Sequence, residues 1–349
     1  VPMLHLLAVT MTATAAAVEE VCTEDLARQR IVIGGWQLLE RHHNKTLAVE
    51  TIQAYLAAGF EAWDTADIYG PSESLLGRAG VRNVFTKYVT SDASELNARS
   101  VNEKSRNALG VVPNLVQFHW WDWSDSGYKK AAQHLTTLKG EGLLGEAAAC
   151  NFDVAHLREL VDLGIPLRAN QVQYSLIDRR PENGMVAFAK QYGLRLACFG
   201  SVAGGLLSDR YLGLSKPPRE LNTVSLRMYK ASLDRWSGGD WSLFQDLLFT
   251  LRRLADKHST TIATVAVCWV LRQLEAASGG WVVLGVRDTT HLEEHKALAK
   301  LVGHGEISRE GVAPRGTLLD EDDEVAIRRI LERGHPPEGD IWSHERGRS

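Results

Sequence analysis

The sequence predicts an α/β fold of the (β/α)8 TIM-barrel type, and three observations lead to this prediction. The chain has 349 residues, a common length for a barrel of this kind folded as one unit. From residue 30 onward, short apolar runs alternate with amphipathic helical patterns, as expected for parallel strands joined by helices. The strand-like runs number eight, and eight parallel strands close a barrel.

The predicted strands are short apolar runs separated by segments long enough to hold a helix. They lie at residues 30–34, 60–64, 83–87, 115–119, 145–151, 167–171, 194–199 and 281–285.

The first two well-marked helices have clear start or stop signals. Residues 44–58 carry apolar side chains at helical spacing, and Gly59 ends the pattern. Asp153 is a favourable N-cap for a second helix, which we expect to stop at Gly164.

Later signals predict two further helices and a long loop. Pro181 stands in the first turn of a helix that ends at Gly193. Thr290 and Glu293 form a predicted capping box for the last helix of the barrel. Residues 212–244 contain Gly, Ser and Pro among aromatic residues, which favours a long loop with substrate contacts.

The chain is predicted to hold one domain with short extensions. Residues 1–22 form a poorly ordered N-terminal extension, residues 23–330 the barrel, and residues 331–349 a polar surface tail. Residues 1–18 are apolar but lack the basic region of a signal peptide. We therefore expect a cytoplasmic protein, with organellar targeting by residues 1–18 as the alternative.

Composition argues against several classes of partner. The net charge is −4 and 23% of the residues are charged, so neither a nucleic acid nor a membrane surface is an expected partner. No apolar run reaches the roughly 20 residues of a membrane span. The cysteines form no CxxC pair, so we expect reduced thiols and no metal site. They are Cys22, Cys150, Cys198 and Cys268.

Four ionisable side chains fall at or just after the ends of three successive predicted strands. Asp64 ends the second strand and Tyr69 follows it, Lys87 ends the third, and His119 ends the fourth. The active site of such barrels lies at the carboxyl ends of the strands, so we expect these residues to meet there. Any one of them alone would be weak evidence, since each has an ordinary structural role.

These residue types suit carbonyl reduction, which needs a hydride at carbon and a proton at oxygen. A phenol is a poor acid at neutral pH, and a neighbouring cation such as Lys87 lowers its pKa. Asp64 can hold Lys87 by a charge-assisted bond. Tyr69 then donates the proton, and His119 orients the carbonyl or shares the proton transfer.

The motifs DTADIYG, FTKY and QFHW, which contain these residues, resemble the catalytic tetrad of the aldo-keto reductases. The resemblance extends from about Gly34 to Lys300. It implies an oxidoreductase that uses NADPH to reduce an aldehyde or ketone, and a small-molecule carbonyl substrate. NADH is a possible second cofactor, and we expect a monomer or a weak homo-oligomer.

The resemblance also assigns residues to the nicotinamide. Cys150 and Asn151, followed by Phe152, resemble the family's SNF motif. With Gln171 they would hydrogen-bond the carboxamide, and Phe199 would stack on the ring.

Two further loops resemble the family's sites for the phosphates and the adenosine. The loop GSVAGGLL would lie over the pyrophosphate, because its glycines allow close backbone approach. Its assigned residues are Gly200, Ser201, Val202, Gly204 and Gly205, with Arg210 just beyond. The loop after the last strand would hold the 2′-phosphate and the adenine. Its assigned residues are Gly285, Arg287, His291, Glu294 and His295.

The aromatic residues Trp36 and Trp120 directly follow the first and fourth predicted strands. In the family, aromatic residues at these positions form the wall of the substrate pocket, and we assign both to it.

The chain departs from the family pattern at several cofactor positions. Cys150 replaces Ser, Gly200 and Ser201 replace Ser-Pro, His291 replaces Gln, and His295 replaces Asn. These changes bear on cofactor affinity and on the choice between NADPH and NADH, and they leave the tetrad unchanged.

Two alternatives remain at this stage. The first is a cofactor-sensing regulatory or binding protein of the same fold, like the β subunits of potassium channels. The second is an aldolase in which Lys87 forms a Schiff base with the substrate.

Overall fold

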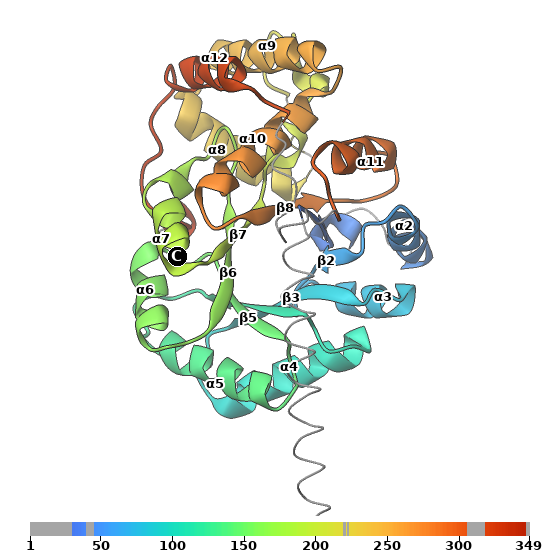
Figure 1. Ribbon diagram of the computed structural model, residues 1–349, viewed down its shortest axis with the longest axis vertical. Helices are drawn as coiled ribbons and strands as arrows, with labels where there is room; N and C mark the ends of the chain where they lie inside the picture. The colour runs from blue at the N-terminus through green and yellow to red at the C-terminus, as the bar shows by residue number, and fades with distance from the viewer. Residues whose placement is uncertain (1–29, 40–44, 219–220, 222, 306–317, 347–349) are drawn as a thin grey trace, which may run out of the picture.

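The described part of the chain forms a closed barrel of parallel strands surrounded by helices (Figure 1). The computed structural model describes residues 30–39, 45–218, 221, 223–305 and 318–346. The strands follow chain order around the barrel, and the last pairs with the first. The predicted fold class is confirmed. The extension at 1–22, with Cys22, and the predicted helix start at Asn44 lie outside the described residues.

Each of the eight predicted strands overlaps an observed one. They are β1 (Ile31–Gly34), β2 (Ala62–Asp64), β3 (Asn83–Thr90), β4 (Leu115–Trp120), β5 (Glu146–Cys150), β6 (Leu167–Gln173), β7 (Arg195–Phe199) and β8 (Gly280–Gly285).

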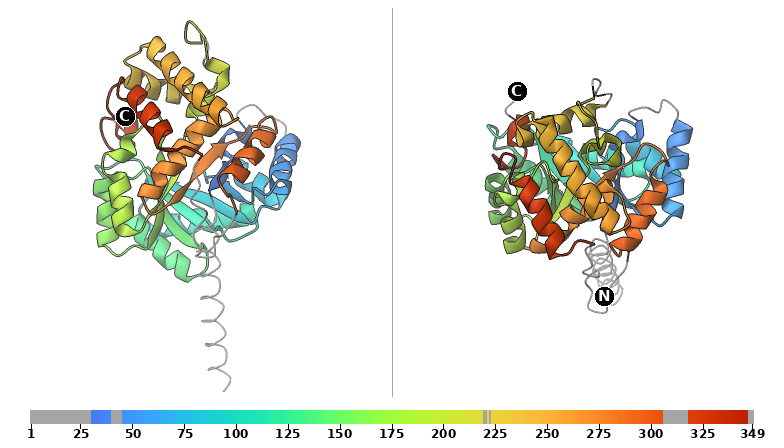
Figure 2. Two further views of the ribbon diagram at one scale, coloured as in Figure 1. Left: turned by 45° about the horizontal axis from the view of Figure 1, so that its top comes forward. Right: turned by 90° about the horizontal axis from the view of Figure 1, so that it is seen from above.

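Helices surround the outside of the barrel, as Figures 1 and 2 both show. The α-helices are α2 (Lys45–Ala57), α3 (Ser72–Ala79), α4 (Glu95–Leu109), α5 (Tyr128–Gly140), α6 (Val154–Asp162), α7 (Met185–Tyr192), α8 (Val224–Ser237), α9 (Trp241–Lys257), α10 (Ile262–Ala276), α11 (Leu292–Leu301), α12 (Glu321–Leu331) and α13 (Ser343–Arg346). Short 3-10 segments are η1 (Trp36–Leu39), η2 (Arg180–Glu182), η3 (Ala203–Gly205) and η4 (Asp209–Tyr211). Among the described helices, none is both long enough and apolar enough to span a membrane.

The barrel has two separate apolar layers, one inside the strands and one between strands and helices. Inside, the rings of Phe85 and Trp281 pack with their centroids 5.4 Å apart. Small residues of the same cluster leave room for these two rings. They are Ala62, Ala148, Ala169 and Ala197.

The helix around Asp153 begins and ends as expected. The Asp153 side chain accepts a hydrogen bond from the His156 backbone N at 2.9 Å, and Gly164 has a φ of 74°. The segment after Pro181 differs from the prediction. It forms η2 first, and α7 starts only after Gly184, whose φ of 116° interrupts the helical path.

Two predictions for the second half of the chain are wrong. Thr290 and Glu293 do not form a capping box, because α11 starts at Leu292 and the Thr290 N–H bonds to Asp288 at 2.8 Å. The region 212–244 is not one long loop, since it contains α8 and the start of α9.

The helices in this region are capped by polar residues that also favour loops. Thr223 accepts a bond from the Leu226 N–H at 3.0 Å, and Asp240 caps α9 through the Ser242 N–H at 2.8 Å. Helices α9, α10 and α12 pack together next to α8, at one end of the molecule in Figure 1.

Candidate active site

A buried ion pair joins the end of β2 to β3, which continues past Lys87 to Thr90 and so is longer than predicted. Lys87 Nζ is 2.5 Å from Asp64 Oδ1, and both residues are at most 5% exposed. The other carboxylate oxygen of Asp64 accepts bonds from Gln117 at 2.8 Å and Gln171 at 2.6 Å. With these partners the pair is fixed in one geometry, as a buried charge requires.

Tyr69 lies beside this pair, in the loop between β2 and α3. Lys87 Nζ is 4.9 Å from the centroid of the Tyr69 ring. The centroids of the Trp36 and Tyr69 rings are 5.6 Å apart. Burial raises the pKa of Tyr69 to about 12, although Lys87 lowers it. The expected effect of the cation is therefore present, and desolvation outweighs it.

Lys87 keeps its charge in this environment. Burial lowers the pKa of Lys87, but the neighbouring Asp64 and Tyr69 raise it, so that it ends above its ordinary value. Its ammonium group also donates to the backbone oxygen of Thr65 at 2.9 Å. Lys87 is thus held as a cation between Asp64 and Tyr69.

His119 at the end of β4 has one nitrogen in use and one available. Nδ1 lies 2.9 Å from the backbone oxygen of Cys150 and must donate, because a carbonyl oxygen only accepts. Nε2 is buried and has no hydrogen-bond partner in the part of the chain that the structure describes. Burial lowers the pKa of His119 to about 4, so the ring is neutral and Nε2 is an acceptor.

The residues expected at the nicotinamide carboxamide lie together at the ends of β5 and β6. Asn151 has a φ of 58° and a buried side-chain oxygen without a partner among the described residues. Gln171 instead directs its amide hydrogens inward, to Asp64 and Gln117. Its oxygen faces Cys150 Sγ at 4.0 Å, so only this oxygen keeps capacity for a ligand.

The glycine-rich loop after β7 has the backbone conformation that glycine permits. Gly200, Gly204 and Gly205 have φ values of 75°, 63° and 93°. Ser201 is 1% exposed, and its hydroxyl has no partner within the described residues. A Cβ on Gly200 would lie 2.5 Å from the Tyr229 ring of α8, so here glycine is required where the family has Ser.

These orphaned polar atoms fit a nicotinamide cofactor. The Asn151 side-chain oxygen can accept from a carboxamide, and the Ser201 hydroxyl can donate to a phosphate. Phe199 is half-buried and ends β7, at the mouth of the barrel. Val202 is half-buried in the same loop, and Arg210 is exposed beyond it.

The residues expected at the adenosine end lie after β8, around the start of α11. Gly285 is exposed and Arg287 is half-buried. His291 pairs with Glu294 at 3.2 Å, whereas His295 Nδ1 lies 3.0 Å from the Tyr55 hydroxyl of α2. His295 therefore packs toward the helical layer through this contact.

The assignment of Trp120 to the substrate pocket is wrong. Its side chain is fully buried, and its ring nitrogen donates to the Asp122 backbone oxygen at 2.8 Å. Side chains alternate along a strand, so a strand that points His119 into the barrel mouth points Trp120 away. Trp121 lies there instead, 4.4 Å from the His119 ring and 50% exposed.

Three residues near the site were missed by sequence reasoning. Gln117 lies two residues before His119, so strand alternation could have placed it on the same face. Trp342 and Arg346 come from the C-terminal tail expected at the surface. The Trp342 ring lies 6.3 Å from His119 and 6.2 Å from Phe199. No local sequence signal predicts contacts over this separation.

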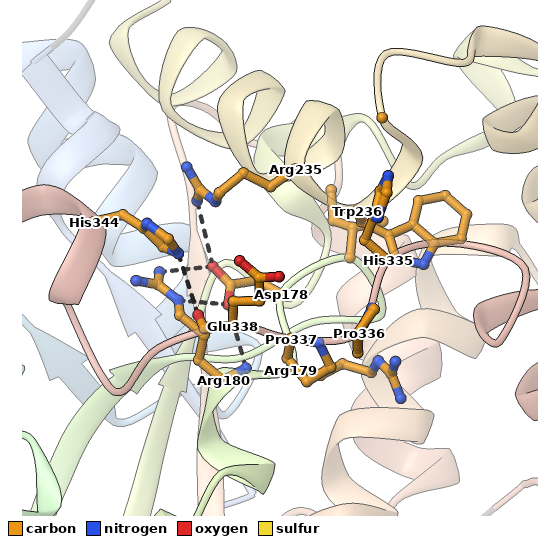
Figure 3. A pocket seen from close by; sticks show the side chains of 12 residues that line it. Asp178, Arg179, Arg180, Arg235, Trp236, His335, Pro336, Pro337, Glu338 and His344 are labelled. Atoms are coloured by element: carbon orange, nitrogen blue, oxygen red, sulfur yellow. Dashed lines mark hydrogen bonds and ion pairs between the residues drawn. The ribbon is translucent and has the colours of Figure 1, made fainter.

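A cavity of about 260 Å³ lies outside the barrel mouth, between the end of α8 and the C-terminal segment (Figure 3). Its lining includes Asp178, Arg180, Arg235 and His344 and none of the predicted site residues. Its arginines are already paired, since Asp178 lies 2.7 Å from Arg180 and 3.9 Å from Arg235. The charged groups of this cavity are therefore bound to one another and lie apart from the predicted site residues.

Comparison with known proteins relates this site to one family. A family model described as the aldo/keto reductase family matches residues 30–303. The human aldo-keto reductase family 7 member A3 is 25% identical over 309 residues, which cover 78% of this chain and 89% of that protein. The NADH-specific methylglyoxal reductase of Escherichia coli is 27% identical over 290 residues, covering 73% and 86%.

A third relative is not named as a reductase. Flagellar radial spoke protein 5 of Chlamydomonas reinhardtii is 29% identical over 184 residues, which cover 46% of this chain and 35% of that protein.

Solved structures share the fold. A glycerol dehydrogenase from Gluconobacter oxydans superposes with a TM-score of 0.70 at 22% identity, covering 89% of this chain and 93% of that one. An aldo/keto reductase from Klebsiella pneumoniae in complex with NADP and acetate gives a TM-score of 0.65 at 18% identity, covering 89% and 94%.

Proposed function

The chain belongs to the aldo/keto reductase family, and from this premise we propose that it reduces aldehydes or ketones to alcohols with NADPH. The observation that carries the proposal is the buried Asp64–Lys87 pair beside Tyr69 at the mouth of the barrel. A reductase needs an acid next to the carbonyl oxygen, and this cluster supplies one.

Asn151, Ser201 and the glycine-rich loop would hold the cofactor, with Phe199 against the nicotinamide ring. When bound, NADPH supplies the hydride. The NADP named with the Klebsiella pneumoniae structure supports this choice. NADH remains a second candidate, because the Escherichia coli relative is named as NADH-specific.

Tyr69 donates the proton to the carbonyl oxygen. Its phenol is a weak acid in the buried site, but the alkoxide that would otherwise form is a stronger base than a phenolate. Lys87 stabilises the phenolate that remains, because the ammonium group lies over the ring and cannot leave Asp64. The proton transfer is thus favourable without a strongly lowered tyrosine pKa.

His119 does not share the proton donation, and it can hold the reacting oxygen only once that oxygen carries a hydrogen. In its neutral form with Nδ1 bonded to the Cys150 carbonyl, Nε2 carries a lone pair and no hydrogen. It therefore accepts a hydrogen bond from the hydroxyl group that the reduction forms. Proton donation falls to Tyr69.

The aldolase alternative is disfavoured by the charge of Lys87. A Schiff-base lysine must lose its proton to attack a carbonyl, and such lysines have a lowered pKa. The pKa of Lys87 is raised by Asp64 and Tyr69 in spite of burial. Treatment with a carbonyl substrate and borohydride should therefore leave Lys87 unlabelled.

A cofactor-sensing binding protein is the second candidate, favoured by the relative named as a flagellar radial spoke protein. This role would combine NADPH binding with very slow turnover and a stable complex with a partner. Rapid multiple turnover of a carbonyl substrate would exclude it.

The proposal is tested by fluorescence titration with NADPH followed by assays on a panel of carbonyl compounds. Tyr69→Phe should lower turnover by several orders of magnitude and leave NADPH binding near normal. Tyr192→Phe is a matched control, because that hydroxyl accepts a hydrogen bond from Arg158 on the outer surface, at 2.8 Å, and lies outside the proposed site. Near-normal turnover in Tyr69→Phe would remove Tyr69 from the acid role.

A further inference from the structure

The C-terminal segment 335–346 is attached to the loops that follow β5 and β6. The Asn183 side chain donates to the backbone oxygens of Pro337 and Gly339, each at 2.8 Å. Asp340 accepts from the Val154 backbone N at 3.0 Å, at the start of α6. These bonds hold the segment against the loops next to the mouth of the barrel.

A buried arginine holds the helix at the end of this segment. The Arg180 guanidinium binds Asp178 at 2.7 Å on one side and Glu345 of α13 at 2.8 Å on the other. Arg180 is 4% exposed, so both pairs are shielded from water. Figure 3 shows Arg180 next to Asp178 at the edge of the outer cavity. The pairing fixes where the next residue, Arg346, can reach.

Arg346 joins the ends of two barrel strands. Its Nη1 donates to the Asn151 backbone oxygen and its Nη2 to the Trp120 backbone oxygen, both at 2.8 Å. Its guanidinium carbon lies 3.9 Å from the centroid of the Trp123 ring, a favourable stacking distance. Trp120 is the last residue of β4, and Asn151 directly follows β5.

His119 and Cys150 are joined by a hydrogen bond, and Arg346 binds the backbone carbonyls of the residues that directly follow them, Trp120 and Asn151. The backbone pairing of β4 with β5 runs only to Phe118 and Ala149. Beyond that pair, β4 and β5 no longer pair with each other, although β4 still pairs with β3 and β5 with β6. Arg346 bridges these two strand ends directly.

From this geometry we propose that Arg346 is a positioning residue of the reduction site: it joins the ends of β4 and β5 and so fixes His119 on Cys150 with Nε2 toward the reacting group. The role rests on the proposed carbonyl reduction. The position of Trp342, 6.3 Å from the His119 ring, is a consequence of the same attachment. The charge of Arg346 also adds to burial in lowering the pKa of His119.

The test compares the full-length protein with Arg346→Met, which keeps an apolar chain over Trp123 and removes both hydrogen bonds. Nitrogen-15 NMR of the imidazole rings reports the protonation state and tautomer of His119, assigned with a His119→Gln variant. In wild type we expect a neutral ring with hydrogen on Nδ1 down to about pH 4. In Arg346→Met we expect loss of the single tautomer and a higher His119 pKa.

The same variant should lower kcat on the order of 10- to 100-fold, as a misplaced site residue does. NADPH affinity should fall less than kcat does, because Arg346 bonds to the Asn151 backbone oxygen and not to the Asn151 side chain that is assigned to the cofactor. Arg346→Lys can reach one carbonyl and should be intermediate in both measurements; it decides the question if the Met variant does not fold. Asn183→Ala, which loosens residues 337–339 and keeps Arg346, should give the wild-type His119 spectrum.

Unchanged His119 signals in both Arg346 variants would overturn the proposal, whatever happens to kcat. A changed His119 spectrum with unchanged kcat would overturn it as well, because the positioning would then have no effect on the reaction. If the His119 spectrum changes but wild type reduces no carbonyl compound, the proposed function fails and the attachment of His119 by Arg346 stands.

Discussion

At the scale of single residues, the neutral state of His119 determines the expected pH dependence of the reduction. Burial lowers the pKa of His119 to about 4, so its folded form favours the neutral ring. We expect kcat to be flat from about pH 5 to pH 8, with no step near the ordinary histidine pKa of about 6.5. Stability should decline as pH falls from about 6.5 toward 4, where the unfolded chain binds the proton more strongly.

Rate profiles and denaturant titrations of wild type and His119→Gln across this range provide the measurement. A step in kcat near pH 6.5 that disappears in His119→Gln would contradict the neutral state of the ring.

Asp67 gives a second residue-scale prediction, of opposite sign. Burial raises the pKa of Asp67 to about 7, with a further rise from nearby Glu73. The folded protein therefore binds this proton more strongly than the unfolded chain, and stability falls as pH rises from about 4 to 7. Asp67→Asn, which keeps an acceptor for the Val89 N–H, should be more stable than wild type at pH 8 by on the order of 1–3 kcal/mol.

The difference in free energy of unfolding between wild type and Asp67→Asn should vanish near pH 4, and this serves as the internal control. Urea unfolding at pH 4.5 and pH 8 measures it. An equal difference at both pH values would show that Asp67 is ionised in the fold.

The tetrad positions could be predicted because each strand end in a barrel points to the same face. Asp64, Lys87 and His119 each fall at a predicted strand end, and the structure brings Lys87 and Asp64 into direct contact. The pKa of Tyr69 could not be predicted, because it depends on burial more than on the neighbouring cation. The position of Trp120 was predictable from strand alternation, which assigns it to the outer face.

At the scale of elements, the contact between α3 and α4 depends on a glycine. A Cβ on Gly77 of α3 would lie 2.6 Å from the backbone oxygen of Ala108 and 2.7 Å from that of Leu109. Backbone atoms cannot move aside as a flexible side chain can, so Gly77→Ala should destabilise the protein by about 1–3 kcal/mol. Helix propensity alone would predict stabilisation by up to about 1 kcal/mol.

Gly140→Ala is the matched control, because Gly140 ends α5, is exposed and has open space around its Cβ position. It should be neutral or stabilising in the same chemical denaturation experiment. Equal effects of the two variants would mean that α3 can move away from α4 without cost.

The elements of the first half were easier to predict than those of the second. Asp153 and Gly164 mark the start and the end of a helix, through an N-cap side chain and a glycine with positive φ. Around residues 212–244, the same Thr and Asp residues that favour loops act as caps of α8 and α9. Capping and loop preferences share one physical cause, the bonding of a short polar side chain to the local backbone, so the sequence alone does not separate them.

At the scale of the whole molecule, the barrel could be predicted and its C-terminal closure could not. Eight apolar runs alternate with helical segments along the chain, and the strands that they form close into a barrel in chain order. The contact between Arg346 and Trp120 joins residues 226 positions apart and depends on the assembled strand ends. Such a contact follows from the fold and leaves no periodic trace in the sequence.

Cofactor binding should stabilise the whole molecule, because the assigned residues lie at the ends of β5, β6 and β7 and in the loop after β8. A ligand at 100 times its Kd adds about 2.7 kcal/mol to the free energy of unfolding. If Arg287 binds the 2′-phosphate, NADPH should raise Tm more than NADH does at equal concentration, and Arg287→Ala should abolish the difference. Thermal unfolding with each cofactor measures this. A difference that persists in Arg287→Ala would assign the 2′-phosphate to another residue, with Arg210 as the next candidate because it is exposed beyond the glycine-rich loop.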